Sequence, residues 1–351
     1  MLTGKILTRK IGCSKAGGTP VMAMLICLFF AACSCAWAAE LHHYVYFNVD
    51  RERISEPSFL DTKAFDGAQI KYTWKQLEPE KDKYDFAMIE KDLDYLKAHG
   101  KRLFIQLQDA SFNPKRNNVP AYLTTDPRYH GGFDFEREDN AKVAEGTVSR
   151  RWDPAVQERY QKLLAALGQK FDGKIEGINL PETSIEFGES GKNFPRGFTP
   201  TVYRDAVISN MKALKKDFPT SVGIQYANFM PGGWDPPPDK SALVSVYRYA
   251  QQDHIGVGGP DLLPGKRSQM THSYKLIHDL HGAVPVGIAV QDGNYSHINP
   301  DTKKRVTTAE QIDFAQKYLG AKYIFWCMEE PFYSRDLLPY MRASDHGSKG
   351  Q

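Results

Sequence analysis

The sequence predicts a single α/β domain with the architecture of a (β/α)8 barrel, or TIM barrel, over residues 39–343. Eight short segments rich in aliphatic, β-branched and aromatic residues alternate with segments whose apolar residues have helical spacing. Polar or acidic residues follow several of these strands, as they do at the C-terminal rim of such a barrel. We find no second domain, repeat or low-complexity region in the sequence, so we expect one core.

The predicted elements follow one another along the chain. The strands are His43–Asp50, Ala68–Trp74, Arg102–Gln108, Ile175–Leu180, Ser221–Phe229, His254–Asp261, Pro285–Asp292 and Lys322–Met328. The helices are Ser58–Phe65, Asp85–His99, Ala155–Phe171, Thr199–Phe218, Lys240–Gln252, Met270–His281, Thr307–Leu319 and Ser334–Met341. Glycines that end helices (Gly100, Gly282 and Gly320) and prolines in first turns (Pro154 and Pro200) support these bounds.

One predicted connection is much longer than the others. The segment Asp109–Asp153 is rich in Pro, Gly, Asn and Arg, and its pattern is that of irregular structure. A loop this long in a compact domain is usually functional, so we expect it to form one wall of a cleft. At the other end of the chain, the polar residues Ser344–Gln351 predict a disordered tail.

Residues 1–38 predict an export signal rather than a part of the fold. An apolar core, Val21–Phe30, follows four basic residues and precedes Ala36-Trp37-Ala38, an A-x-A cleavage pattern. The core is too short for a membrane span. We therefore expect a mature protein that starts near Ala39 and is secreted or periplasmic. Cys33 lies in a sequence that resembles a bacterial lipoprotein box, so a lipid anchor there is a weaker alternative.

The net charge and the positions of cysteine and histidine exclude several classes of partner and cofactor. The formal net charge is +3, but residues 1–38 hold four basic and no acidic residues, so the mature chain carries −1. This near-neutral balance argues against a nucleic-acid partner. Of the five cysteines only Cys327 lies outside residues 1–38, and one thiol forms no intramolecular disulfide. Histidines such as His43 and His254 are scattered without zinc-ligand spacing, so we expect no metal and no cofactor.

The stretch Ile175–Thr183 (IEGINLPET) places an acidic residue at the end of the fourth strand. Its apolar run stops at Pro181, which fixes the backbone immediately before Glu182. A buried strand that ends in an acidic residue is how a (β/α)8 barrel presents a catalytic acid. The simpler alternative is a salt bridge at the rim. If the strand end is misplaced, Glu186 or Glu189 supplies the acid instead.

A second group of residues carries a family resemblance. The segment Lys71–Tyr95 contains Trp74, Leu77-Glu78-Pro79 and Tyr84-Asp85-Phe86 before an amphipathic helix. It resembles the second-strand region of clan A glycoside hydrolases, the β-galactosidase-like and cellulase-like (β/α)8 enzymes. The third strand and Trp326, at the end of the eighth strand, fit the same pattern. The resemblance implies retaining hydrolysis by two glutamates, an acid that ends the fourth strand and a nucleophile that ends the seventh.

The sequence matches one of these two positions. Glu182 falls at the acid position, although the usual adjacent Asn-Glu pair is spread to Asn179-Leu180-Pro181-Glu182. At the nucleophile position stands an amide, Gln291, with Asp292 beside it. Glycosidic cleavage needs one protonated and one ionised carboxyl group. The candidates for the ionised group are Asp292, Glu329 and Glu330, with Asp261 a weaker one; each also suits a turn or an exposed position.

Aromatic and amide side chains near strand ends predict a sugar-binding surface. We expect Trp74 and Trp326 to stack on sugar rings, whereas Trp152 and Trp234 suit either that role or loop anchoring. The other candidates for substrate binding are Gln108, Asn179, Tyr226, Asn228 and Gln291.

These features predict a secreted glycoside hydrolase that cleaves O-glycosidic bonds of a poly- or oligosaccharide with a carboxylate pair. One alternative, favoured by Gln291, is a carbohydrate-binding pseudo-glycosidase that has lost the nucleophile. Another is a hydrolase with a different carboxylate pair, which includes an inverting one.

Overall fold

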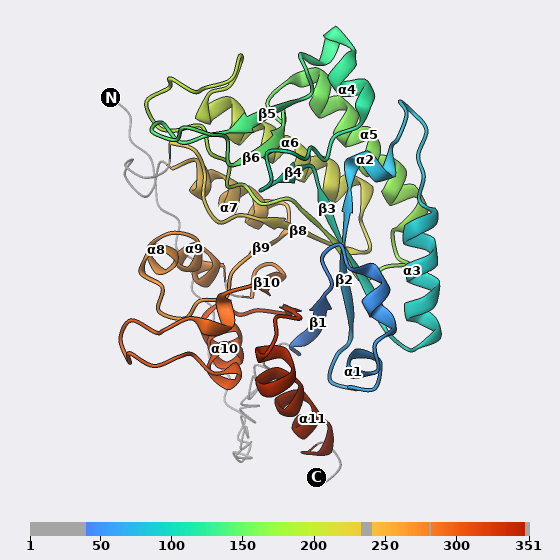
Figure 1. Cartoon of the computed structure of the whole chain (residues 1–351), viewed down its shortest axis with the longest axis vertical. Coiled ribbons are helices and arrows are strands. Elements are labelled where there is room, and N and C mark those ends of the chain that lie inside the picture. The colour runs from blue at the N-terminus through green and yellow to red at the C-terminus, as the bar shows by residue number, and fades with distance from the viewer. Residues whose placement is uncertain (1–39, 233–240, 281, 348–351) are drawn as a thin grey trace, which may run out of the picture. The chain divides into compact units, whose positions relative to one another are not determined.

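The computed structural model describes residues 40–232, 241–280 and 282–347, and it contains a closed barrel of eight parallel strands (Figure 1). The strands are β1 (His42–Tyr46), β2 (Gly67–Thr73), β3 (Arg102–Gln108), β7 (Gly177–Leu180), β8 (Val222–Tyr226), β9 (Gly256–Gly259), β10 (Val286–Val290) and β11 (Tyr323–Cys327). Each begins within two residues of its predicted start, and the predicted single (β/α)8 barrel is confirmed. The predicted export signal, with Cys33, and Trp234 lie outside the described residues.

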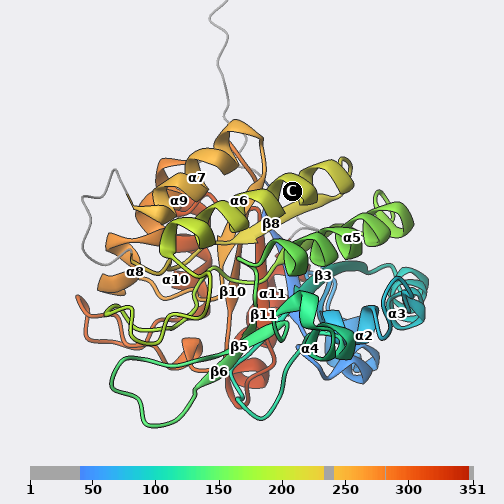
Figure 2. The ribbon, with the colours of Figure 1, turned by 90° about the horizontal axis from the view of Figure 1, so that it is seen from above.

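Helices lie around the outside of the barrel (Figure 2). The longer ones are α3 (Ala87–Ala98), α5 (Pro154–Phe171), α6 (Pro200–Asp217), α7 (Ala242–Gln252) and α11 (Leu338–Gly347). The shorter ones are η1 (Arg51–Ser55), α1 (Pro57–Leu60), α2 (Trp74–Leu77), α4 (Ala121–Thr125), η2 (Pro127–Tyr129), α8 (Arg267–Thr271), α9 (Ser273–Asp279), η4 (Asn294–Ser296), α10 (Thr308–Asp313), η5 (Phe314–Tyr318) and η6 (Tyr333–Leu337). The side chains of Asp153, Thr199 and Ser241 cap α5, α6 and α7 by accepting hydrogen bonds from their first turns.

Two predictions near the C-terminus differ from the structure. The predicted helix Met270–His281 is two helices, α8 and α9, which meet at His272, where φ is −117° and ψ is −102°. Helix α11 runs to Gly347, so the predicted disordered tail is wrong for residues 344–347. Residues 348–351 lie outside the described part of the chain. None of the helices that the structure describes has the length and apolar character needed to cross a membrane.

The long connection between β3 and α5, residues 109–153, is more ordered than predicted; we call it the insert. It contains α4 and a three-stranded antiparallel sheet in the order β4 (Ala110–Ser111), β6 (Gly146–Ser149) and β5 (Phe133–Glu136). Because it begins at the C-terminal end of β3, it lies at the rim of the barrel, where Figure 1 shows it beyond the end of that strand. Its strands have only 2 or 4 residues, too few for a recognisable alternation in sequence.

Contacts between non-neighbouring strands identify the side chains inside the barrel. The rings of Phe104 on β3 and Phe325 on β11 lie 4.9 Å apart, so they meet across the interior. Glycine makes room for them, since a Cβ on Gly177 would lie 2.5 Å from the Phe104 ring. Side chains of a strand alternate between faces. The register therefore places these residues inside, near the C-terminal ends of their strands: Tyr46, Lys71, Gln106, Asn179, Tyr226 and Cys327.

Candidate active site

A layer of hydrogen-bonded side chains lies inside the barrel below its C-terminal rim. Gln69 Nε2 donates to Asn179 Oδ1 at 2.8 Å and to Tyr226 Oη at 3.1 Å. All three side chains are at most 2% exposed, so Asn179 and Tyr226, predicted to bind substrate, lie beneath the site and support it. Gln69 Oε1, Gln106 Oε1 and Asn228 Oδ1 are buried and accept no hydrogen bond from the described residues. They are acceptors suited to hydroxyl groups.

Glu182 lies above this layer, two residues past the end of β7, and it is partly exposed. Asn228, two residues past β8, donates from Nδ2 to Glu182 Oε2 at 2.7 Å, so it orients the carboxyl group. Burial raises the pKa of Glu182 to about 7. The Asn228 hydrogen bond lowers this pKa, the charge of Asp261 raises it, and the charges of Arg151 and Lys71 lower it. The predicted acid is thus a carboxyl group that changes its protonation state near neutral pH.

Lys71 on β2 is a cation of this site that the sequence analysis did not single out. Its side chain points into the barrel, with Nζ 5.8 Å from the centroid of the Tyr46 ring. Burial lowers the pKa of Lys71 to about 8, and the charge of Glu182 raises it. One lysine within the apolar predicted strand Ala68–Trp74 is the signal in the sequence that marks it.

Arg151, at the end of the insert, fixes the backbone of Glu182. Its guanidinium donates to both carboxylate oxygens of Asp109, at 2.9 and 2.6 Å, and to the Glu182 carbonyl oxygen at 2.8 Å. Tyr203 Oη on α6 accepts from Arg151 at 2.8 Å and donates to the Thr183 carbonyl oxygen at 3.0 Å. Arg151 and Asp109 are 6% and 1% exposed, so this ion pair lies inside the protein. The sequence analysis assigned neither residue a role.

The two predicted second carboxylates lie at the ends of β10 and β11. Asp292 is exposed, and its carboxylate, Cys327 Sγ and the Glu329 carboxylate each have an atom within 4.8 Å of the others. Glu329 Oε2 accepts a hydrogen bond from Gly293 N at 2.8 Å, so Glu329 holds the turn that carries Asp292. Gln291 continues the series of interior positions on β10. An amide therefore stands where this strand would present a carboxylate to the interior.

The same group is a possible set of metal ligands among the described residues. Cysteine binds metals as the thiolate. Burial and the nearby charge of Asp292 raise the pKa of Cys327, which opposes the thiolate form.

The other acidic candidates each accept a hydrogen bond from a nearby group. Glu330 is exposed and accepts a hydrogen bond from Ser334 Oγ at 2.6 Å. Asp261 is partly exposed and accepts from Asn294 Nδ2 at 3.0 Å, and it acts on Glu182 through its charge. Glu186 Oε1 accepts from the backbone two residues further on, at 2.6 Å.

The prediction that Trp74 and Trp326 stack on sugar rings is wrong, since both side chains are 0% exposed. Cys327 is an interior position of β11, so by strand alternation Trp326 lies on the outer side of the barrel. Trp74 begins α2, and its ring packs on Tyr160 of α5, with the ring centroids 5.2 Å apart. Trp74 Nε1 donates to Glu78 Oε2 at 2.8 Å in that outer layer.

Two other candidates also have structural roles. Gln108 Oε1 accepts from the backbone N–H groups of Asp109 and Ala110, at 3.2 and 3.3 Å, and so shapes the start of the insert. Trp152 is 4% exposed and packs edge to face on Phe187, which makes it a loop anchor, one of its two predicted roles.

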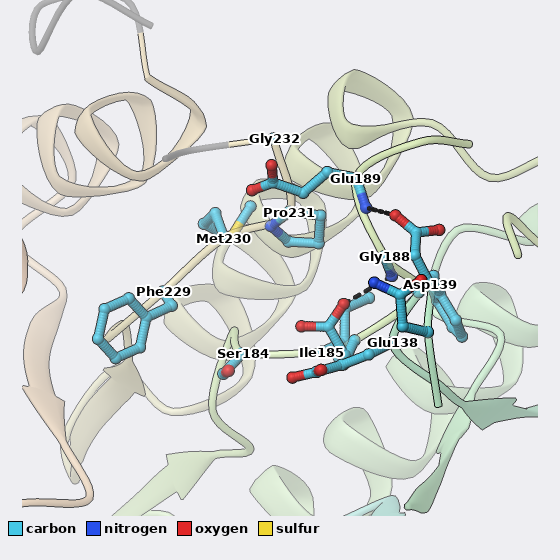
Figure 3. Close-up of a pocket in the computed structure, with 13 residues that line it drawn as sticks. Glu138, Asp139, Ser184, Ile185, Gly188, Glu189, Phe229, Met230, Pro231 and Gly232 are labelled. Atoms are coloured by element: carbon cyan, nitrogen blue, oxygen red, sulfur yellow. Dashed lines mark hydrogen bonds between the residues drawn. The ribbon is translucent and has the colours of Figure 1, made fainter. Parts of the chain in front are cut away.

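A cavity of about 380 Å³ adjoins the loop that follows Glu182. The insert, this loop and the loop after β8 line it, with Phe229 and Met230 on one side and Glu138 and Asp139 on the other (Figure 3). Its volume is in the usual range for small-molecule sites, about 300–1,000 Å³. Residues of the insert thus form one wall of a hollow along the loop that follows Glu182, although Glu182 is not among the residues that line it.

Comparisons with known proteins identify the fold class of the chain. No protein-family model matches it, and no curated protein sequence does. The structure is similar to xylanase 10B from Thermotoga petrophila RKU-1, with a TM-score of 0.52 and 11% identity over 89% of this chain and 95% of the xylanase. It is also similar to the β-galactosidase from Bacillus circulans sp. alkalophilus, with a TM-score of 0.55 and 9% identity over 82% of this chain. The match spans 50% of the β-galactosidase chain. The resemblance to clan A glycoside hydrolase barrels is therefore confirmed for the fold.

Proposed function

We propose that this protein is a glycoside hydrolase that cleaves O-glycosidic bonds of a poly- or oligosaccharide. The observation that carries the proposal is the position of the Glu182 carboxyl group and its hydrogen bond with Asn228, together with its raised pKa. Its carboxyl group lies at the C-terminal mouth of the barrel, partly exposed and held by Asn228, with its pKa raised to about 7. A protonated carboxyl group at this position is what a leaving oxygen requires.

In this proposal Glu182 gives its proton to the glycosidic oxygen as the bond from that oxygen to the anomeric carbon breaks. Asp292 supplies the second, ionised carboxylate, which attacks the anomeric carbon or removes a proton from an attacking water. The hydrogen bond from Gly293 to Glu329 holds the turn of Asp292. The acceptor oxygens of Gln106 and Asn228, nearer the mouth of the barrel than Gln69, would receive sugar hydroxyl groups.

The test is a screen of purified protein against a panel of polysaccharides and oligosaccharides, read by release of reducing ends. Xylan and β-galactosides belong in the panel because the two structural neighbours are a xylanase and a β-galactosidase. NMR of the first product identifies retention or inversion at the anomeric carbon. Binding of a glycan without cleavage would favour the alternative, a carbohydrate-binding pseudo-glycosidase, which the amide of Gln291 supports.

The rate should depend on pH through the proton of Glu182. The acid acts in its protonated form, which is present below its pKa of about 7 and is lost as the pH rises through that value. On the alkaline side kcat/KM should fall by about tenfold per pH unit. Rates measured from pH 4 to 9 check this, and a profile that stays flat to pH 9 would exclude Glu182 as the acid.

We also propose that residues 1–38 direct export and that the mature protein begins near Ala39. N-terminal sequencing of the protein from its native host should find that start. Recovery of a cytosolic protein that retains Met1 would contradict the proposal.

A further inference from the structure

Lys71 is a cation inside the barrel that lies level with the polar side chains below the mouth. The strand register pairs Lys71 of β2 with Gln106 of β3, which in turn pairs with Asn179 of β7. The interior below this level is filled by the rings of Phe104 and Phe325. Because Lys71 is partly exposed and its side chain points into the barrel, its exposed part faces the mouth.

Lys71 differs from the buried cations of the described residues in having no partner. Lys101, Arg151 and Arg159 each have acceptors, which are two carbonyl oxygens for Lys101 and carboxylates for the arginines. Within the part of the chain that the structure describes, Lys71 Nζ forms no hydrogen bond and has no carboxylate oxygen within 4.0 Å. It lies 5.8 Å from the centroid of the Tyr46 ring.

Glu182 does not balance the charge of Lys71. The two groups are near enough for each charge to act on the pKa of the other, but they form no ion pair, and the Glu182 carboxyl group accepts its hydrogen bond from Asn228. In the protonated form that the acid needs, Glu182 carries no charge at all. Burial lowers the pKa of Lys71 to about 8, so its ammonium group is still charged at neutral pH.

An ammonium group that is withdrawn from water is unfavourable unless a partner replaces that water. Lysine has three N–H donors and no acceptor, and its strongest hydrogen bonds are to carboxylate or other anionic oxygens. A site for a neutral hydroxyl group could use an amide instead, without the cost of a charge. Beside Lys71, Gln106 Oε1 is buried and accepts no hydrogen bond from the described residues, so it suits a hydroxyl group of the same sugar.

The acidic groups of the mouth lie away from Lys71. Asp261 and Asp292 follow β9 and β10, and the strand order places these strands across the barrel from β2. Opposite charges on opposite sides of the mouth would turn an anionic group of a bound sugar toward β2.

We propose that Lys71 binds an anionic group of the sugar held beside Glu182, so that the ligand is an acidic glycan that carries a uronate carboxylate or a sulfate ester. The inference rests on the proposed function for the place of the sugar, and it adds the class of sugar, which that proposal leaves open.

The test is binding of sugar probes in pairs that differ in charge, measured by calorimetry below pH 7. The uronate pairs are the methyl glycosides of glucuronate and galacturonate, each with its methyl ester. The sulfate pairs are glucose 6-sulfate with glucose and galactose 6-sulfate with galactose. In at least one pair the anionic probe should bind about 10–100-fold more tightly than its neutral partner, the gain expected from charge-assisted hydrogen bonds. The arm that shows this preference identifies the anion.

Variants of Lys71 assign the preference to this residue. Lys71→Met should bring the ratio of the two dissociation constants close to one, and Lys71→Arg, which keeps the charge, should retain part of it. The matched control is Lys174→Met, which removes an exposed cation shortly before β7, at the other end of the barrel, and should keep the wild-type ratio. The comparison within a pair needs only the wild type, so it stands even where a variant does not fold.

Binding requires no cleavage, so the outcomes separate this inference from the proposed function. If an anionic probe binds through Lys71 and no glycan is cleaved, the proposed function fails and the inference stands. If a glycan is cleaved but every anionic probe binds no better than its neutral partner, the inference fails and the proposed function stands. A preference that Lys71→Met leaves unchanged would also overturn the inference.

Discussion

Replacing Glu182 by glutamine should slow hydrolysis of a natural glycan by about 10²–10⁴-fold, the range that general acid catalysis contributes. The amide keeps nearly the shape of the carboxyl group and still accepts the hydrogen bond from Asn228. It has no proton acidic enough to give to the leaving oxygen, so bond cleavage is slowed while sugar binding is retained. Reducing-end assays and a calorimetric binding titration measure the two effects separately.

The matched control is Glu80→Gln, which changes a carboxylate that is 68% exposed in the loop after β2 and should keep the wild-type rate. An aryl glycoside with a good leaving group needs little protonation of the leaving oxygen. The rate at which Glu182→Gln expels that group should therefore fall much less than its rate on the natural glycan. If Glu182→Gln hydrolyses the natural glycan as fast as the control does, another residue is the acid.

Replacing Asp109 by alanine should lower the free energy of unfolding by about 3–5 kcal/mol, the usual cost of breaking a buried ion pair. Asp109 and Arg151 are almost fully buried, and a guanidinium does not lose its charge in proteins. The variant therefore leaves a buried cation without its carboxylate. Because Arg151 also binds the Glu182 carbonyl oxygen, the rate should fall as well. Urea denaturation and the rate assay measure the two losses.

Glu158→Ala is the control for this variant. Glu158 and Lys162 on α5 form an ion pair of 2.8 Å whose side chains are 65% and 50% exposed. Removing one partner of such a pair should change the free energy of unfolding by at most about 0.5 kcal/mol. A loss in Asp109→Ala as small as this one would show that the buried pair does not hold the site together.

The barrel could be predicted from the sequence because several local signals agree at each element. Helix α5, for example, has an apolar face, Pro154 in its first turn and Asp153 as its cap. Gly100 ends the preceding helix with φ at +68°, a conformation that favours glycine. Such signals depend on a few adjacent residues, so each element can be recognised without knowledge of its neighbours in space.

The position of Glu182 could also be predicted, because a strand end followed by proline is a local signal as well. The sequence does not show in the same way which side chains of a strand face the barrel interior. The strands of a parallel barrel are buried on both faces, so their apolar runs show no alternation. The prediction that Trp74, directly after β2, and Trp326, on β11, face a sugar is wrong for this reason, since both are buried. The charged residue Lys71 marks the inward face of β2, because a cation in such a strand needs a polar interior to face.

The charges around Glu182 depend on contacts that no short sequence pattern contains. Arg151 and Glu136 contact the segment after β7 because the insert folds back as an antiparallel sheet. Its strands are too short to be recognised, and the Asp109–Arg151 pair joins residues that the sequence separates by 42 positions.

The insert also bears on how such a protein can diverge. Arg151, which binds the Glu182 backbone, its partner Asp109, and Glu136, which binds the Glu186 backbone, belong to one continuous segment between a strand and a helix. A change of length or sequence in that segment would retune the proton affinity of the candidate acid while the eight strands stayed as they are. Selection on chemistry and selection on the scaffold would then act on different parts of the gene.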